Sequence, residues 1–249
     1  MLSGIDHLVI LVANLESAIE SYRTQGFTVV PGGRHPTGTH NALIGLADGS
    51  YLELLAFHEP NTASKWWLKL AQGGGLIAVC LQTDDLQQEI AGFRDAGVSM
   101  GDPKPLSRVR PDGYHLSWVL SLHEGTPPDV VPFLIEDKTP RGERVPKETK
   151  HRNEVVGVGT VTVAVDDLAT IRRWYSAVLK QQGHPIERTE LDAAGIRFMI
   201  GPHTFDFVAP VGSSGAISDW LRRRGPSPHS LTLKTAAGSI LNPTITPTG

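Results

Sequence analysis

The sequence contains a single cysteine, Cys80, among 249 residues, so no disulfide can form within the chain. Cys80 lies in an apolar run, residues 76–81, where a buried and unreactive thiol is typical. No stretch of about 18 consecutive apolar residues occurs, and residues 1–7 lack the charged and then apolar segments of a signal peptide. We therefore expect a cytoplasmic protein with no disulfide and no membrane span.

An excess of basic charge is also lacking, because the formal net charge is -3. Phosphate backbones and anionic lipid surfaces attract proteins through such an excess, so neither nucleic acid nor a membrane is an expected partner. The basic run 222–224 precedes a Gly-Pro pair and is typical of a solvated helix end. With 40% hydrophobic and 20% charged residues, the composition is that of an ordinary globular protein.

One pattern recurs three times: a short apolar strand, an Asn or Asp followed by Leu, an amphipathic helix and a glycine. The three copies span residues 5–26, 76–97 and 158–183. In each copy the side chain of the Asn or Asp is expected to cap the first helical turn, and the glycine to end the helix. The capping residues are Asn14, Asp85 and Asp167.

Segments rich in β-branched and aromatic residues follow each glycine, with turn signals between them. In the first copy these segments are residues 27–30, 41–46 and 51–57. Each copy is therefore interpreted as a βαβββ module, and the fold class as α+β. A strand-like segment at 230–235 predicts a fourth, truncated module.

The polar stretch 137–153, with its prolines and glycine, is the best candidate for a linker between two halves. We place a domain boundary within it. The predicted domains are residues 1–145, with two paired modules, and residues 146–249, with one module and a truncated one.

Four motifs resemble the vicinal oxygen chelate superfamily, which includes glyoxalase I, extradiol dioxygenases and bleomycin-resistance proteins. They are Ile-Asp-His-Leu-Val-Ile at 5–10, Gly-Thr-His-Asn-Ala-Leu at 38–43, Tyr-Leu-Glu-Leu-Leu at 51–55 and Pro-Phe-Leu-Ile-Glu at 132–136. Within the superfamily, the motifs look like the glyoxalase-like domain branch. The resemblance covers about residues 1–137 and extends further only through the repeats.

The resemblance implies that two modules pair into curled, cup-shaped mixed sheets with the helices outside. In this superfamily a divalent metal ion in the cup chelates adjacent oxygens of the substrate. His7 matches the histidine of the family's first strand, and Glu53 matches the glutamate of its last strand. The resemblance therefore makes His7 and Glu53 the candidate metal ligands and catalytic residues.

Because side chains alternate along a strand, the sequence predicts which residues of the first and last strands face the cup. The residues expected to face the cup are Ile5, His7, Val9 and Leu11 in the first strand and Tyr51, Glu53 and Leu55 in the last. The residues expected to face the helix are Asp6, Leu8, Ile10 and Val12. Glu53 then lies among apolar neighbours, where a metal or a histidinium would offset the cost of burying its charge.

The second module lacks matching ligands, because Ala78 stands where a second histidine is expected and Phe133 where a second carboxylate is expected. Catalytic metal sites usually have about three protein ligands, so His7 and Glu53 form half of a site. The candidates to complete it are His40, His115 and Glu136. The alternative account of the pair is a direct hydrogen bond between His7 and Glu53 without a metal.

The segment 34–41 brings several hydrogen-bonding side chains together, which suits an oxygen-rich ligand at the mouth of the cup. The candidate substrate-binding residues are His35, Thr39, His40 and Asn41, with Trp118 and Phe133 as apolar walls. The alternative interpretations are a solvated β-turn for the segment and plain core for the aromatic residues.

The third copy keeps one possible ligand, because Thr160 replaces the histidine and Asp206 stands in the place of Glu53. His229 in the fourth copy is one residue out of phase with that position. We therefore expect the second half to serve as scaffold or interface. Exposed sheet edges in the truncated module favour a homodimer.

Together these patterns predict a glyoxalase-like protein that binds a small oxygenated metabolite in the cup of residues 1–137. One hypothesis is a lyase, isomerase or dioxygenase that depends on a divalent metal ion. A second is a metal-free binding protein of the bleomycin-resistance type. A third is a structural or partner-binding repeat protein. The fold hosts all of these activities, so the choice depends on the geometry of the site.

Overall fold

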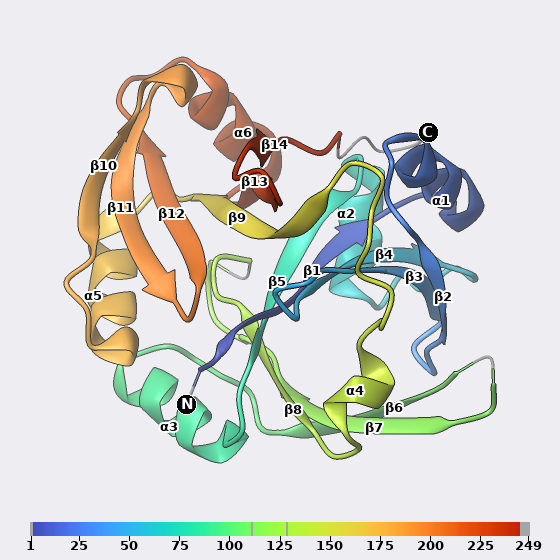
Figure 1. Cartoon of the computed structure of the whole chain (residues 1–249). Helices are drawn as coiled ribbons and strands as arrows, with labels where there is room; N and C mark the ends of the chain where they lie inside the picture. Colours follow the sequence, from blue (N-terminus) through green and yellow to red (C-terminus); the bar gives the residue numbers. More distant parts are fainter. Residues whose placement is uncertain (1, 111, 128, 245–249) are drawn as a thin grey trace.

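The computed structural model describes residues 2–110, 112–127 and 129–244, which form an eight-stranded barrel and a separate six-stranded sheet (Figure 1). The barrel strands are β1 (Gly4–Leu11), β2 (Val30–Arg34), β3 (Thr39–Gly45), β4 (Tyr51–Phe57), β5 (Gly75–Gln82), β6 (Lys104–Val109), β7 (His115–Ser121) and β8 (Phe133–Asp137). The strands of the second sheet are β9 (Val155–Ala164), β10 (His184–Arg188), β11 (Ala193–Ile200), β12 (His203–Pro210), β13 (Ser227–Thr235) and β14 (Ile240–Leu241).

Each of the first two modules supplies half of the barrel, with strand orders β1-β4-β3-β2 and β5-β8-β7-β6. Within each half the first strand runs parallel to the last, and the other neighbours are antiparallel. A long antiparallel ladder between β1 and β5 joins the halves, whereas β2 and β6 pair only at Arg34 and Val109. The predicted α+β fold of paired, curled mixed sheets is therefore confirmed.

Three helices begin at the predicted caps and lie on the outside of the sheets (Figure 1). The caps are Asn14 for α1 (Leu15–Thr24), Asp85 for α3 (Leu86–Asp95) and Asp167 for α5 (Leu168–Leu179), each accepting a hydrogen bond from an amide three residues on. The other helices are α2 (Lys65–Ala71), α4 (Arg141–Arg144), α6 (Ala216–Arg224) and the 3-10 turn η1 (Thr189–Leu191). Among the described residues, no helix combines the length and the hydropathy that crossing a membrane requires.

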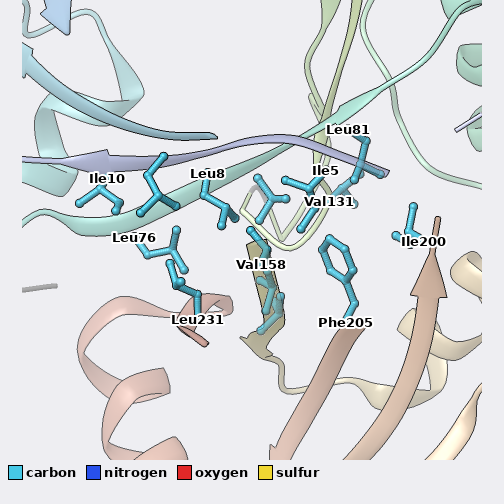
Figure 2. Close-up of a cluster of buried hydrophobic side chains, with 14 of the residues drawn as sticks. Ile5, Leu8, Ile10, Leu76, Leu81, Val131, Val158, Ile200, Phe205 and Leu231 are labelled. Carbon is cyan, nitrogen blue, oxygen red and sulfur yellow. The ribbon is translucent and has the colours of Figure 1, made fainter. Parts of the chain in front are cut away.

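The second sheet packs on the outer face of the barrel where β1 and β5 meet. Leu8 and Ile10 of β1 belong to the same buried cluster as Val158, Phe205 and Leu231 of the second sheet, and Figure 2 shows the two sets of side chains facing each other. The prediction that this face of β1 packs on a helix is therefore incomplete, because the second half of the chain also covers this face. The strand that carries His7 is thus held between the cup and a second hydrophobic layer.

Strand β1 departs from simple alternation near its start. Its register against β5 shifts between Ile5 and His7, which is the signature of a β-bulge. Ile5 consequently lies in the outer cluster with Leu8, whereas Val9 lies in the cluster inside the barrel. The expectation that Ile5 faces the cup beside His7 is wrong, and so is the expectation that Asp6 faces the helix of its module.

The polar stretch 137–153 packs back onto the barrel. It contains the short helix α4, and further along the amide of Thr28 donates to His151 Nδ1 at 3.0 Å. The hydroxyl of Thr28 donates to the carbonyl of Lys150 at 2.7 Å. This stretch therefore supplies side chains to the first half, and the domain boundary near residue 145 stays a prediction.

A polar contact also links the two sheets at the turn between β3 and β4. The Asp48 carboxylate accepts a hydrogen bond from the Val158 amide at 2.7 Å and lies 3.3 Å from His203 Nε2. His203 Nδ1 accepts from the Ile5 amide at 2.9 Å, so its Nε2 carries the proton that faces Asp48. Burial alone would raise the pKa of Asp48, but the hydrogen bonds from His203, Ser50 and Val158 outweigh it and leave the pKa below its usual value.

We expect Asp48→Ala to lower the free energy of unfolding by about 1–3 kcal/mol at neutral pH, because the Val158 amide and His203 lose their acceptor. Because folding lowers the pKa of Asp48, its contribution is present above the unfolded-state pKa and is lost as the pH falls below about 4. The difference in the free energy of unfolding between Asp48→Ala and the wild type should therefore shrink as the pH falls below about 4. Urea unfolding at several pH values measures both effects.

The control for this experiment is Asp102→Ala, which removes a carboxylate that is 86% exposed and pairs with Arg94 at the surface. Its effect should stay within about 0.5 kcal/mol. Equal losses in the two variants, or a difference for Asp48→Ala that does not depend on pH, would contradict the role given to Asp48.

Candidate functional site

The barrel encloses a cavity of about 240 Å³ whose lining has a polar part and an apolar part. Its polar side chains include His7, His35, Thr39, Asn41, Glu53, Lys65, Arg108 and Arg144. Its main apolar walls are Leu55, Trp66, Trp118, Leu120, Phe133 and Ile135. The first module therefore supplies most of the polar groups, and the second supplies an apolar wall plus Arg108.

His7 and Glu53 face the same cavity from the neighbouring parallel strands β1 and β4. His7 Nε2 lies 3.5 Å from Glu53 Oε2, which is longer than a normal hydrogen bond. The imidazole stacks on the Tyr51 ring at 4.7 Å, and the edge of Phe133 meets it at 5.3 Å. The ring of His7 is thus held in one orientation by packing on two sides.

A hydrogen bond to Asp6 determines which nitrogen of His7 carries the proton. His7 Nδ1 lies 2.6 Å from Asp6 Oδ1, and because a carboxylate accepts, Nδ1 is the protonated nitrogen. Burial lowers the pKa of His7 to about 4, against the opposing effect of Glu53, so the ring is neutral at pH 7. The bare Nε2 lone pair and the Glu53 carboxylate then face each other as two acceptors. A cation or a hydrogen-bond donor between them would satisfy both.

Asp6 is held in turn by arginines of α4. The Arg144 guanidinium donates to both carboxylate oxygens of Asp6, at 2.8 and 2.7 Å, and Arg141 also contacts this carboxylate. Arg144 further bonds Asp137 and the Tyr51 hydroxyl, the latter at 2.8 Å. Every charge of this network is paired, so the network fixes Asp6, and Asp6 fixes His7.

His35 brings a second imidazole to the Glu53 carboxylate. Its Nε2 lies 4.0 Å from Glu53 Oε1, and its Nδ1 lies 2.9 Å from the Thr39 hydroxyl. Burial lowers the pKa of His35, which favours the neutral ring. The Asn41 amide donates a short hydrogen bond to Glu53 Oε1 and so orients the carboxylate. Two imidazoles and one carboxylate therefore converge in the cavity.

Two groups of side chains are candidates to hold a divalent cation. Asp6, His7 and Cys80 offer ligand atoms within 4.8 Å of one another. This group does not fit a cation, because Arg141 and Arg144 neutralise Asp6, His7 Nδ1 carries a proton, and burial raises the pKa of the Cys80 thiol well above its usual value.

The group formed by His7 Nε2, His35 Nε2 and Glu53 has ligand chemistry that suits a divalent cation better. Two neutral imidazoles and a carboxylate are the ligands of many zinc and non-haem iron sites. Asp6 and Thr39, which bond the distal nitrogens of the two rings, are in the position of the outer partners that orient metal-binding histidines.

The structure places most of the candidate substrate-binding residues in the cavity lining: His35, Thr39, Asn41, Trp118 and Phe133. His40 lies outside this lining, because alternation along β3 turns it away from Thr39 and Asn41, and its ring packs on His58 at 5.9 Å. His115 is exposed, and Glu136 accepts from the Leu86 amide at the start of α3. These three side chains therefore do not complete the site.

In the second half, the carboxylate of Asp206 is already engaged. Arg188 donates to it at 2.8 Å, and Arg197 donates at 2.7 and 2.8 Å. The ring of His229 packs on Trp220 at 4.9 Å. This half supports the cup through its packing against the outer face of β1.

Sequence reasoning missed Arg108, Trp66 and Arg144. Strand β6 was not anticipated, because four of its six residues are Lys104, Pro105, Ser107 and Arg108. The available signal was the alternation of Leu106 and Arg108, which places both on the inner face. Arg144 lies in the stretch 137–153, which was interpreted as a linker, and no sequence pattern there predicted a contact with the cavity.

Comparison with known proteins agrees with this architecture. The family model described as glyoxalase-like domain matches residues 5–179. No curated protein matches the sequence of this chain.

Several solved structures share the fold. A hypothetical protein from Staphylococcus aureus superimposes with a TM-score of 0.67 and 15% identity, over 95% of this chain and 97% of that one. A mutant of 4-hydroxymandelate synthase from Streptomyces coelicolor has a TM-score of 0.61 and 17% identity, over 94% of this chain and 71% of that one. Such low identities show the fold alone. Since the family model covers well over half of the sequence, the chain belongs to the glyoxalase-like domain family.

Proposed function

We propose that the barrel cavity binds a divalent metal ion through His7, His35 and Glu53, and that the protein is a metal-dependent enzyme for a small oxygenated metabolite. The proposed reaction class is that of lyases, isomerases and dioxygenases that act on adjacent oxygens. The observation that carries the proposal is the 3.5 Å approach of an unprotonated His7 Nε2 to the Glu53 carboxylate. Two acceptors that face each other in a buried cavity are a stable arrangement once a cation joins them.

The supporting residues have separable roles in this proposal. Asp6 keeps the proton on His7 Nδ1, and Thr39 lies beside the corresponding nitrogen of His35. Asn41 holds one oxygen of Glu53, which leaves the other directed at His7. These contacts fix the three ligand side chains before anything binds, and such preorganisation strengthens binding and catalysis.

A bound divalent metal supplies Lewis-acid polarisation of the substrate oxygens. The walls formed by Trp118 and Phe133 exclude water from this region, which strengthens electrostatic interactions inside the cavity. Trp66 of α2 lines the same cavity, and its buried indole Nε1 has no hydrogen-bond partner among the residues that the structure describes. It offers a donor to an oxygen of the substrate.

A metal-free binding protein is the second candidate function. The apolar wall contributed by β7 and β8 favours it, because the second module adds no metal ligand to the cup. Ligand binding in that case would rely on apolar contact and on the unoccupied polar groups of the first module.

We expect the protein purified without chelator, or reconstituted with Fe(II), Mn(II) or Zn(II), to hold about one metal ion per chain. His7→Ala and Glu53→Ala should each reduce the bound metal at least tenfold, because each removes one of three ligands. Elemental analysis by mass spectrometry, together with the melting temperature of each variant, measures this.

The control variant is His58→Ala, because His58 packs on His40 and does not line the cavity. It should retain the metal content of the wild type. Near-zero metal in the reconstituted wild type, or full metal in His7→Ala and Glu53→Ala, would rule out the metal site and leave the binding protein.

A further inference from the structure

Arg108 is a buried cation that no carboxylate of the described residues contacts directly. The residue is 5% exposed, and its Nη1 is fully buried with no hydrogen-bond partner. Among the described residues, none forms a salt bridge or a hydrogen bond with the Arg108 guanidinium. An arginine keeps its charge in proteins, so this site carries the cost of an unpaired buried charge.

Arg144 differs from Arg108 in its ion pairing. Arg144 lines the same cavity, yet its guanidinium is paired with Asp6 and Asp137. Glu53 is the only carboxylate among the described lining residues, and it is bonded by Asn41 and flanked by two histidines instead. Arg108 therefore lies in the same lining as Glu53 without a direct ion pair to it among the described residues.

The backbone beside Arg108 leaves room for this side chain and for Asn41. A Cβ at Gly32 would come within 2.0 Å of Asn41 Oδ1 and 2.9 Å of Arg108 Nη1, so only glycine fits there. The Oδ1 of Asn41 is likewise buried and has no hydrogen-bond partner. A buried donor and a buried acceptor thus lie around one glycine, and neither is satisfied by the described residues.

The rest of the cavity lining indicates the size and polarity of a ligand for these two groups. Trp118, Phe133 and Leu120 form an apolar wall opposite the polar groups of the first module. The volume of about 240 Å³ is smaller than that of pockets for drug-sized ligands, which are roughly 300–1,000 Å³. Lys65 of α2 adds a further positive charge to the lining. A compact anion with an apolar body matches this combination of size, charge and wall.

We infer that Arg108 is the anion-binding residue of the cavity and that the ligand is a small monocarboxylate with an aromatic or branched apolar body. The guanidinium holds the carboxylate in a bidentate pair, and Trp118 and Phe133 contact the body. This inference rests on the proposed function for the location of the ligand, but it does not require that a metal be bound.

Two isosteric probes, phenylacetate and phenylacetamide, test the inference by isothermal titration calorimetry. The wild type should bind phenylacetate at least tenfold more tightly than phenylacetamide, because only the carboxylate pairs with Arg108. Arg108→Gln should abolish the preference, and Arg108→Lys should retain part of it. Lys104→Gln, which removes a cation from the same strand outside the cavity lining, should leave the preference unchanged.

His7→Ala separates this inference from the proposed function. If the metal is lost and the preference for phenylacetate persists in His7→Ala, both proposals stand. If the wild type holds no metal but keeps an Arg108-dependent preference, the metal proposal fails alone. Equal affinities of the wild type for the two probes, no binding of either probe, or a preference that survives in Arg108→Gln overturns the carboxylate inference.

Thermal unfolding gives an independent prediction for the same residue. Because the buried charge of Arg108 has no partner in the free protein, Arg108→Met should raise the melting temperature in the absence of ligand. Saturating phenylacetate should raise the melting temperature of the wild type and leave that of Arg108→Met unchanged. A large drop in the melting temperature of Arg108→Met would show a structural role and overturn the inference.

Discussion

The buried Asp6 carboxylate is the contact on which the arrangement of the cup depends. It is 0% exposed and lies between Arg144 and the Nδ1 of His7. One side of Asp6 thus anchors α4 to the barrel, and the other fixes the tautomer of His7. Removing this carboxylate would leave Arg144 partly unpaired and free His7 to adopt either tautomer. A single buried charge therefore couples the fold of the 137–153 stretch to the chemistry of the cup.

The two halves of the chain contribute in different ways to this site. The first module provides the converging ligands His7, His35 and Glu53, while the second provides apolar walls and one unpaired cation, Arg108. The sheet of β9–β14 buries the outer face of β1 and β5. Strand β1 is thereby fixed on both faces. The asymmetry follows from the sequences of the modules, since Ala78 and Phe133 occupy the places where a symmetric second set of ligands would stand.

Much of the fold could be predicted from sequence because its signals are local. Helix caps such as Asn14 and Asp85, and the alternation of Tyr51, Glu53 and Leu55, depend only on neighbours along the chain. The pairing of the modules was available only through the resemblance.

What escaped prediction depends on contacts between distant residues. The bulge at Ile5 is determined by pairing with β5, and the position of Arg144 by a salt bridge to Asp6, 138 residues away. His40 and His35 look equivalent in the sequence, but β3 begins at Thr39 and its register turns His40 outwards. Strand β6 is too polar for a periodicity argument, so the one unpaired arginine of the cup was overlooked.

The most direct test of the account is anomalous diffraction from crystals grown with Mn(II) or Fe(II), recorded at the absorption edge of the metal. We expect one strong peak within coordination distance of His7 Nε2, His35 Nε2 and Glu53. No peak in the barrel, or a peak beside Asp6 and Cys80, would contradict it.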